Sequence, residues 1–170
     1  MNVIYTLEEV NHDRNKHSIF LAGPTPRSKE VKSWRPKALE FLKSSGYDGV
    51  IYVPEFNPKV GMPDPFDPIN MYEWEHEALT NSTVIVFWVP RELVSMPAFT
   101  TNIEAGRFFS DARSLYGRPD DAPKNEYIDW YYKKVSSKKP YDIMEDLLWE
   151  AMWHFYSAAQ WKKYADGVSE

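Results

Sequence analysis

Two short apolar runs separated by a helical repeat constrain the fold of this chain more than any other feature of its sequence. The run Ser18 to Ala22 is followed by a turn and then by apolar residues at helical spacing from Val31 to Leu42. Gly46 stands where that helix is expected to stop, and a second apolar run follows at Gly49 to Val53. A strand–helix–strand unit implies a parallel sheet covered by helices, so we expect an α/β fold.

The remainder of the chain continues this alternation. Five prolines between Pro54 and Pro68 exclude regular structure there and predict a long, stiff connection across the end of the sheet. The run Thr83 to Val89 is continuous, β-branched and aromatic, so it is expected to be the central strand. Further elements are expected as helices over about 70–81, from near Thr100 to about Arg113 and over 141–164, with a short strand over 114–117.

The 170 residues are close to the usual size of one domain, about 100 to 150 residues. We therefore predict a single-domain flavodoxin/Rossmann-like parallel sheet flanked by helices, with an extra C-terminal helix. The single domain is expected to span residues 1–170, with a core over about 18–117 and a helical extension over about 126–165. One face of the last helix carries an aromatic stripe, which suits core or a subunit interface: Leu148, Trp149, Met152, Trp153 and Tyr156.

Composition excludes several classes of protein. The chain has no cysteine, so it has neither disulfides nor a thiolate zinc site, and its four histidines show no ligand spacing. No apolar run approaches the roughly 20 residues that cross a bilayer, and the N-terminus has no signal-peptide core. The net charge of −5, with both signs mixed along the chain, argues against a nucleic-acid polymer as partner. We expect a cytoplasmic protein that binds a small molecule and needs no metal.

Glu75 is the first candidate functional residue. In the expected helix over 70–81 the buried stripe is Met71, Trp74, Ala78 and Leu79, and Glu75 falls on it, whereas Glu73 and Glu77 face the other way. A carboxylate on an apolar face is costly to desolvate unless it is paired or lines a cavity. The spacing leaves two readings open: a functional acid, or a buried Glu bonded to Arg or backbone.

Glu104 is the second candidate, one loop beyond the strand over 83–89. Ligands of open α/β sheets bind at the carboxyl ends of the strands. With Thr100 or Thr101 as N-cap, the helix dipole would keep Glu104 ionised, as a nucleophile requires. The alternative is a plain capping box from Thr101 to Glu104, and the local pattern by itself favours that alternative.

The turn Gly23 to Arg27 is the third candidate. Gly23 permits close approach of backbone to a ligand, and the following amides suit a phosphate, although this signal is weak. The glycines of a dinucleotide fingerprint and the lysine of a phosphate-binding Walker loop are absent, so no nucleotide cofactor is indicated. A serine-hydrolase elbow is also missing.

Three segments together resemble the nucleoside 2-deoxyribosyltransferase-like family: FLAGPTPR from Phe20, MYEWEHEALTNSTVIVFWVP from Met71 and FTTNIEAGRF from Phe99. The resemblance covers roughly Ser18 to Gly117. It implies that Glu75 contacts the sugar of a nucleoside and that Glu104, in a Glu-x-Gly motif with Gly106, is the nucleophile. The resemblance is what favours a catalytic Glu104 over the capping box.

What the resemblance implies about the reaction is cleavage of an N-glycosidic bond in a nucleoside or nucleoside 5′-monophosphate. Glu104 would attack the anomeric carbon, and Glu75 would orient the sugar hydroxyls or protonate the departing base. The sugar then passes to another base in a transferase or to water in an N-glycosidase. No cofactor is implied, and related enzymes are homo-oligomers. A non-catalytic nucleotide-binding sensor that uses the same pocket is the alternative.

The sequence departs from the family pattern at two positions. Phe20 replaces a tyrosine before the glycine loop, and Ala98 replaces an Asp or Ser six residues before the nucleophile. Other residues are expected to supply substrate contacts, with Trp88 or the proline-rich loop stacking on a base. The expected substrate-binding residues are Phe20, Gly23, Pro24, Thr25, Arg27, Trp88, Arg91, Thr101 and Asn102.

Overall fold

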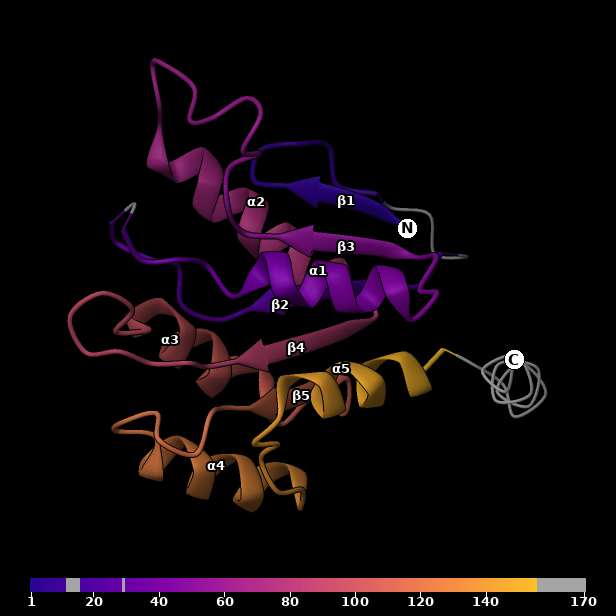
Figure 1. The fold of residues 1–170 in the computed structure, drawn as a ribbon, viewed down its shortest axis with the longest axis vertical. Coiled ribbons are helices and arrows are strands. Elements are labelled where there is room, and N and C mark those ends of the chain that lie inside the picture. Colours follow the sequence, from indigo (N-terminus) through magenta and orange to yellow (C-terminus); the bar gives the residue numbers. More distant parts are fainter. Residues whose placement is uncertain (12–15, 29, 156–170) are drawn as a thin grey trace.

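The computed structural model describes residues 1–11, 16–28 and 30–155, and in these ranges it confirms the α/β fold (Figure 1). Five parallel strands form one sheet in the order β1-β3-β2-β4-β5. The strands are β1 (Asn2–Tyr5), β2 (Ser18–Ala22), β3 (Val50–Val53), β4 (Val84–Trp88) and β5 (Ser114–Gly117). The helices are α1 (Arg35–Ser44), α2 (Pro68–Asn81), α3 (Phe99–Phe108), α4 (Glu126–Ser136) and α5 (Met144–Trp153).

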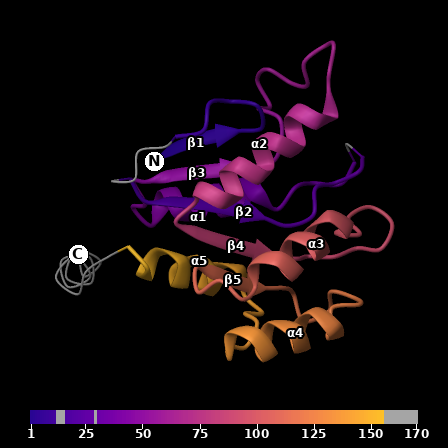
Figure 2. The same cartoon turned by 180° about the vertical axis from the view of Figure 1, so that it is seen from behind.

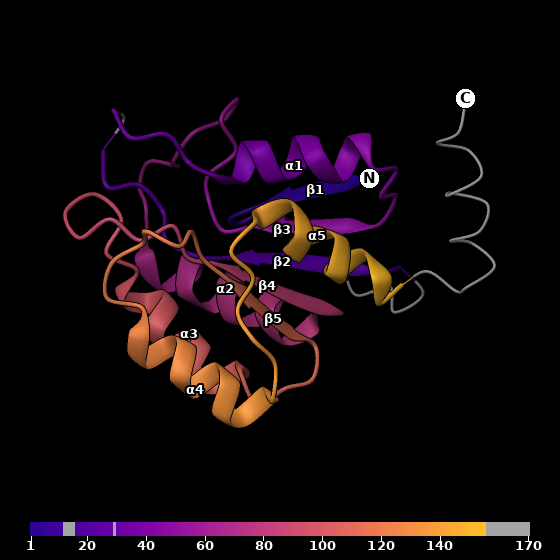
Figure 3. The same ribbon diagram turned by 60° about the horizontal axis from the view of Figure 1, so that its bottom comes forward.

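The helices lie on both faces of the sheet. Helices α2, α3 and α4 lie on one face (Figure 2), and α1 and α5 lie on the other, as the tilted view makes clear (Figure 3). Because side chains alternate along a strand, Phe20 packs under α2 and α3, whereas its neighbours Ile19 and Leu21 pack against α1 and α5. Strands buried on both faces explain the continuous apolar runs in the sequence.

The middle strand of the sheet is β2, so the expectation that the run over 83–89 is central was wrong. Strand β4 lies between β2 and β5 and is fully buried, which is why its sequence is equally apolar. Strand β1 was not predicted, because it is only four residues long, only Ile4 of them is buried, and a polar, acidic segment follows it. It pairs with β3 at the sheet edge.

Two helices begin earlier than expected. Helix α2 begins at Pro68, with the Asp67 side chain accepting a hydrogen bond from the Ile69 amide at 2.9 Å. Helix α3 begins at Phe99, after Ala98 in the left-handed conformation (φ 60°, ψ 39°), and ends at Phe108 rather than near residue 113. The chain turns there because Phe109 is buried and β5 starts only a few residues later.

Helix α5 packs against the sheet beside α1. Leu148 and Met152 are fully buried, and Trp149 meets the ring of Phe41 edge-on at 5.7 Å between centroids. Trp153 is 54% exposed. The helix was expected to run from 141 to 164; it begins at Met144, and the part of the expected stripe beyond residue 155 lies outside the described residues. None of the helices in the described ranges is long and apolar enough to span a membrane.

Candidate active site

The turn after β2 passes directly against the end of β4. Gly23 has φ +149°, and a Cβ there would lie 2.1 Å from the carbonyl oxygen of Trp88. No other residue fits without moving one of the two strands. The close contact places the turn at the carboxyl edge of the sheet, where ligands of open α/β sheets bind.

Glu75 lies where the sequence pattern placed it, on the sheet-facing side of α2. Trp74, Ala78 and Leu79 are buried beneath the helix, and the Trp74 indole donates to the Glu8 carbonyl at 2.7 Å, which fixes the rotation of α2. Glu75 is partly buried, whereas Glu73 and Glu77 are exposed. The side chain of Glu75 has no hydrogen-bond or ion-pair partner among the residues that the structure describes.

Glu104 lies in the second turn of α3. Since Ala98 is the N-cap, Glu104 is the sixth helical residue, and the capping box from Thr101 is not formed. The argument that the first-turn amides keep Glu104 ionised is therefore also wrong. Like Glu75, Glu104 is partly buried and has no hydrogen-bond or ion-pair partner within the described part of the chain.

Two adjoining cavities lie at this edge of the sheet. The larger, of about 370 Å³, is bounded by the turn after β2, the start of the proline-rich loop, α2 and the beginning of α3. The smaller, of about 230 Å³, lies between α2 and α3 and contains both carboxyl groups, Glu75 and Glu104. Three residues line both cavities, namely Tyr72, Glu75 and Thr100, so the cavities form one continuous site.

The two carboxyl groups have unusual protonation equilibria. Burial raises the pKa of Glu75, and the positive charge of Arg35 partly opposes that rise. Burial, and then the charge of Glu75, raise the pKa of Glu104 to about 8, again against the influence of Arg35. Two carboxyls so close do not both ionise readily, and they titrate as a pair. Near neutral pH the pair therefore retains a proton. Such pairs are typical of sites that move protons.

A contact between helices lies beside the smaller cavity. Arg107 on α3 lies with its Nη1 2.9 Å from Nδ1 of His76 on α2. Both side chains line the cavity that contains the two carboxyls. This contact holds α2 and α3 side by side, and with them Glu75 and Glu104.

Comparison with known protein families finds one family for this sequence. The sequence model described as nucleoside 2-deoxyribosyltransferase like matches residues 16–122, which is more than half of the chain. The chain belongs to this family. No curated protein matches the sequence as a relative. The matched range contains Glu75, Glu104 and every other residue that lines the two cavities except Thr6, which directly follows β1.

Membership in the nucleoside 2-deoxyribosyltransferase-like family makes the two departures informative. Phe20 is fully buried in the core cluster beneath α2 and α3, on the same sheet face as the carboxyl pair. A tyrosine hydroxyl at this position would be directed toward that face, and here the position is apolar. Ala98 lines the larger cavity and has a left-handed backbone, so its small side chain leaves room at the start of α3.

Four of the expected substrate-binding residues come together at the larger cavity. Gly23, Pro24, Thr25 and Arg27 all line its wall. The Arg27 guanidinium lies over the ring of Phe99, 5.3 Å from its centroid, and the Arg27 amide donates to the Ser95 carbonyl at 3.0 Å. The turn is thus tied to the loop before α3.

The other expected substrate-binding residues do not line either cavity. Trp88 is buried on the opposite face of the sheet, packed with α1 and α5, because alternation along β4 directs it away from α2. Phe20 is core, and Thr101 is buried within α3. The proline-rich loop, in contrast, does reach the site through Phe56.

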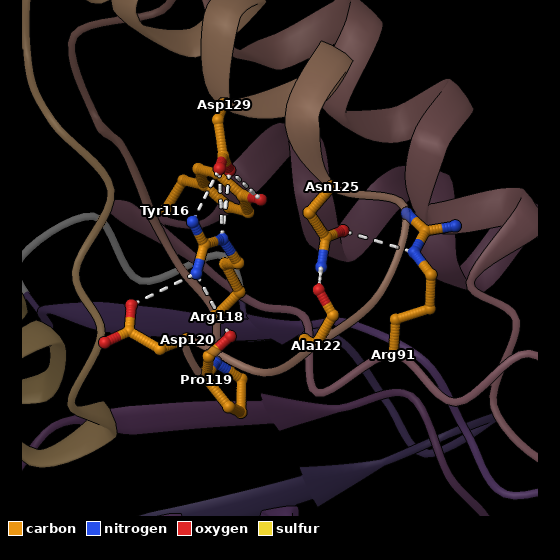
Figure 4. A network of polar contacts seen from close by, with 8 residues as sticks. All are labelled: Arg91, Tyr116, Arg118, Pro119, Asp120, Ala122, Asn125 and Asp129. Carbon is orange, nitrogen blue, oxygen red and sulfur yellow. Dashed lines mark hydrogen bonds and ion pairs between the residues drawn. The ribbon is translucent and has the colours of Figure 1, made fainter.

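Arg91 and Asn102 belong to a structural network that joins three segments. Arg91 donates to Asn102 Oδ1 and to the Pro97 carbonyl, each at 2.7 Å, and to Asn125 Oδ1 at 3.1 Å. Asn125 in turn donates to the Ala122 carbonyl (Figure 4). Because Arg91 is buried with its donors in use, it fixes the loop before α3 rather than contacting a ligand.

Figure 4 also shows how α4 is fastened to the sheet. The Tyr116 hydroxyl donates to Asp129 at 2.8 Å, and Arg118 forms an ion pair with the same carboxylate at 2.7 Å. Helix α4 thereby covers the back of α3 and supports the side of that helix opposite Glu104.

One charged residue near the site was not singled out from the sequence. Arg35 is only 1% exposed and, among the described residues, is the one charged side chain that shifts the pKa of both Glu75 and Glu104. The sequence did contain a sign of its burial. Arg35 lies three residues before Ala38 and seven before Leu42, so helical spacing places it on the buried face of α1. The argument that selected Glu75 applies equally to Arg35.

Proposed function

We propose that this protein cleaves the N-glycosidic bond of a nucleoside or nucleoside 5′-monophosphate, with Glu104 as nucleophile and Glu75 as its acidic partner. The observation that carries the proposal is a pair of partly buried carboxyls in one cavity, neither with a hydrogen-bond or ion-pair partner among the described residues. A purely structural carboxyl at such a position would be expected to have an arginine or backbone partner. Membership in the nucleoside 2-deoxyribosyltransferase-like family gives the pair its substrate class.

In the proposed mechanism, a carboxylate oxygen of Glu104 attacks the anomeric carbon as the bond to the base breaks. The transition state has oxocarbenium character, and the product is a glycosyl ester on Glu104 together with the free base. A second displacement, by another base or by water, releases the sugar with retained configuration. The first acceptor gives a transferase and the second an N-glycosidase.

The proton that the departing base needs is available on the carboxyl pair. The resting place of the shared proton is mainly Glu104, because burial and the charge of Glu75 raise the pKa of Glu104 to about 8. The reactive arrangement is the other one, in which the proton has moved to Glu75 and Glu104 is ionised. Glu75 then donates its proton to the base as the base leaves. This division of roles uses the raised pKa of both groups, because neither would hold a proton near neutral pH at its ordinary value.

The larger cavity suits the remainder of the substrate. Phe56 and Tyr72 line it and can stack on a base, in place of the buried Trp88. Gly23 to Arg27 form its opposite wall and suit the sugar or a 5′-phosphate. Its volume of about 370 Å³ is at the lower end of the range of about 300 to 1,000 Å³ for small-molecule sites.

The experiment that tests the proposal is incubation with a panel of nucleosides and nucleoside 5′-monophosphates, in ribose and 2-deoxyribose forms, with and without a second base. Chromatography follows the free base and any new nucleoside. A new nucleoside identifies a transferase, and free base and sugar identify an N-glycosidase. No base release from any member of the panel would contradict the proposal.

The second candidate is a non-catalytic sensor that binds a nucleotide in the same cavity. The apolar, fully buried Phe20 favours it, because no tyrosine hydroxyl is available at that position to hold the nucleophile. Binding of intact nucleotides, measured by calorimetry, without any release of base is the result that would select the sensor.

We also propose a homo-oligomer. Several large apolar side chains are exposed on α3, α4 and α5, and such groups are typical of association surfaces. They are Ile103 at 76%, Tyr127 at 74%, Trp130 at 56% and Trp153 at 54%. The aromatic stripe on α5 offers less exposed surface for association than expected, because Leu148 and Met152 are buried in the core. Sedimentation at micromolar concentration tests this proposal, and a single species of 20 kDa would contradict it.

A further inference from the structure

Arg35, the first residue of α1, fastens the turn that forms one wall of the larger cavity. Its guanidinium donates to the carbonyls of Leu21, Gly23 and Pro24 at 3.0, 2.7 and 3.4 Å, and to Thr25 Oγ1 at 3.1 Å. These acceptors follow one another along the end of β2 and the turn. Because a guanidinium is a rigid planar fork, it fixes their relative positions.

The charge of Arg35 is only partly balanced. Its counter-ion is Glu55, with Nη1 and Oε1 2.6 Å apart, and Glu55 also accepts a hydrogen bond from Ser33. Glu55 is 20% exposed, whereas Arg35 is 1% exposed. Water therefore screens the carboxylate of Glu55 more than the guanidinium, and a part of the positive charge acts on neighbouring groups.

The groups that feel this charge are Glu75 and Glu104. Arg35 favours the ionised form of each, against the burial that disfavours it. Four other charged or titratable groups line the cavities, namely Arg27, Tyr72, His76 and Arg107, and all four are exposed. Solvent screens them, so Arg35 is the cation with the greatest influence on the pair.

We propose that Arg35 is a positioning residue for the carboxyl pair: it holds the Gly23–Thr25 turn at the wall of the cavity that Glu75 also lines, and it places a buried positive charge, moderated by Glu55, behind that wall. This role rests on the proposed function of Glu104 as nucleophile. It assigns to Arg35 on α1 and to Glu55, the second residue after β3, a part in the reaction, although neither lines the cavity.

The test uses two substitutions that change the charge at one place in opposite directions. Arg35→Met removes the positive charge, and Glu55→Gln leaves that charge without its counter-ion. The carboxyl carbons of Glu75 and Glu104 are followed by ¹³C NMR titration of the free protein. We expect the titration of the pair to move up by about one pH unit or more in Arg35→Met and to move down in Glu55→Gln.

A purely structural role predicts a different pattern. If Arg35 and Glu55 only brace the turn, both substitutions loosen the same ion pair and move the titration in the same direction or not at all, which would overturn the proposal. Arg35→Lys separates the two parts of the role, because it keeps the charge but loses the fork. We expect it to leave the titration close to that of the wild type and to raise KM. If Arg35→Met does not fold, the other two variants still test the proposal, because it requires a downward shift in Glu55→Gln and an unchanged titration in Arg35→Lys.

The titration also separates this proposal from the proposed function. It is measured on the free protein, so it gives the same answer whether or not any nucleoside is cleaved. Opposed shifts without base release would sink the catalytic assignment and retain the electrostatic role of Arg35. Base release with unchanged titrations in both variants would retain the activity and overturn the role of Arg35.

Discussion

Glu75 on α2 and Glu104 on α3 line one cavity, and the negative charge of the first raises the pKa of the second. Neither carboxyl has a hydrogen-bond or ion-pair partner in the part of the chain that the structure describes. The pair lies at the carboxyl edge of the sheet, beside the turn that begins at Gly23, a position where no side chain fits. Each of the following predictions depends on this pair.

Glu104→Gln is expected to lower base release by roughly 10³-fold or more while the fold is retained. The amide keeps the size of the side chain but cannot attack the anomeric carbon. Because Glu104 has no partner in the described residues, the substitution leaves no buried group unpaired. Single-turnover rates and circular dichroism check the two parts, and a variant with wild-type rates would remove Glu104 from the reaction.

Glu75→Gln is expected to lower turnover by about 10²- to 10⁴-fold, the usual contribution of a general acid, with little effect on stability. Glu73→Gln and Glu77→Gln are matched controls on the same helix, since both side chains are exposed. They are expected to retain the wild-type rate. Equal losses in all three variants would mean that the effect comes from α2 as a whole.

The rate of base release is expected to follow a bell-shaped pH profile with a descending limb near pH 8. Below the limb the pair retains one proton, and above it both groups are ionised and the proton for the base is lost. The apparent pKa that sets this limb is a property of the coupled pair rather than of either residue. It should disappear in Glu75→Gln, and a rate that keeps rising above pH 8 in the wild type would show that Glu75 only orients the sugar.

Stability is expected to fall as the pH rises from about 5 toward 9. The pKa of Glu104 is higher in the folded protein than in the unfolded chain, so the folded state binds the additional proton and is favoured at the lower pH. Glu104→Gln lacks this proton equilibrium. Thermal unfolding should give similar Tm values for variant and wild type near pH 5 and a Tm a few degrees higher for the variant near pH 9. A constant difference across this range would contradict the raised pKa.

The sequence predicted most of the strands and helices. Its clearest signals were the continuous apolar runs of β2, β3 and β4, which are buried on both faces of the sheet. It failed at the sheet edge, where β1 is short and only Ile4 is buried. It also failed on strand order, because β2 and β4 are equally apolar and only tertiary pairing distinguishes them. The start of α3 was missed because it follows a left-handed Ala98, which no propensity indicates.

For the site, spacing selected Glu75 as a candidate, and the family resemblance favoured Glu104. The reason given for an ionised Glu104 was wrong, since it depended on a helix N-cap two or three residues too late, and burial raises the pKa instead. The direction of Trp88 required strand register, which the sequence does not contain. Arg35 could have been predicted from the same periodicity that selected Glu75.

The most direct test of the account is covalent trapping with a slowly reacting nucleoside whose sugar carries fluorine. The electron-withdrawing fluorine slows both displacements, so a glycosyl ester accumulates on the nucleophile. Digestion and mass spectrometry then locate the added sugar. The account predicts one adduct, on Glu104, that is absent from Glu104→Gln. An adduct on any other residue, Glu75 included, would contradict the assignment of Glu104 as nucleophile.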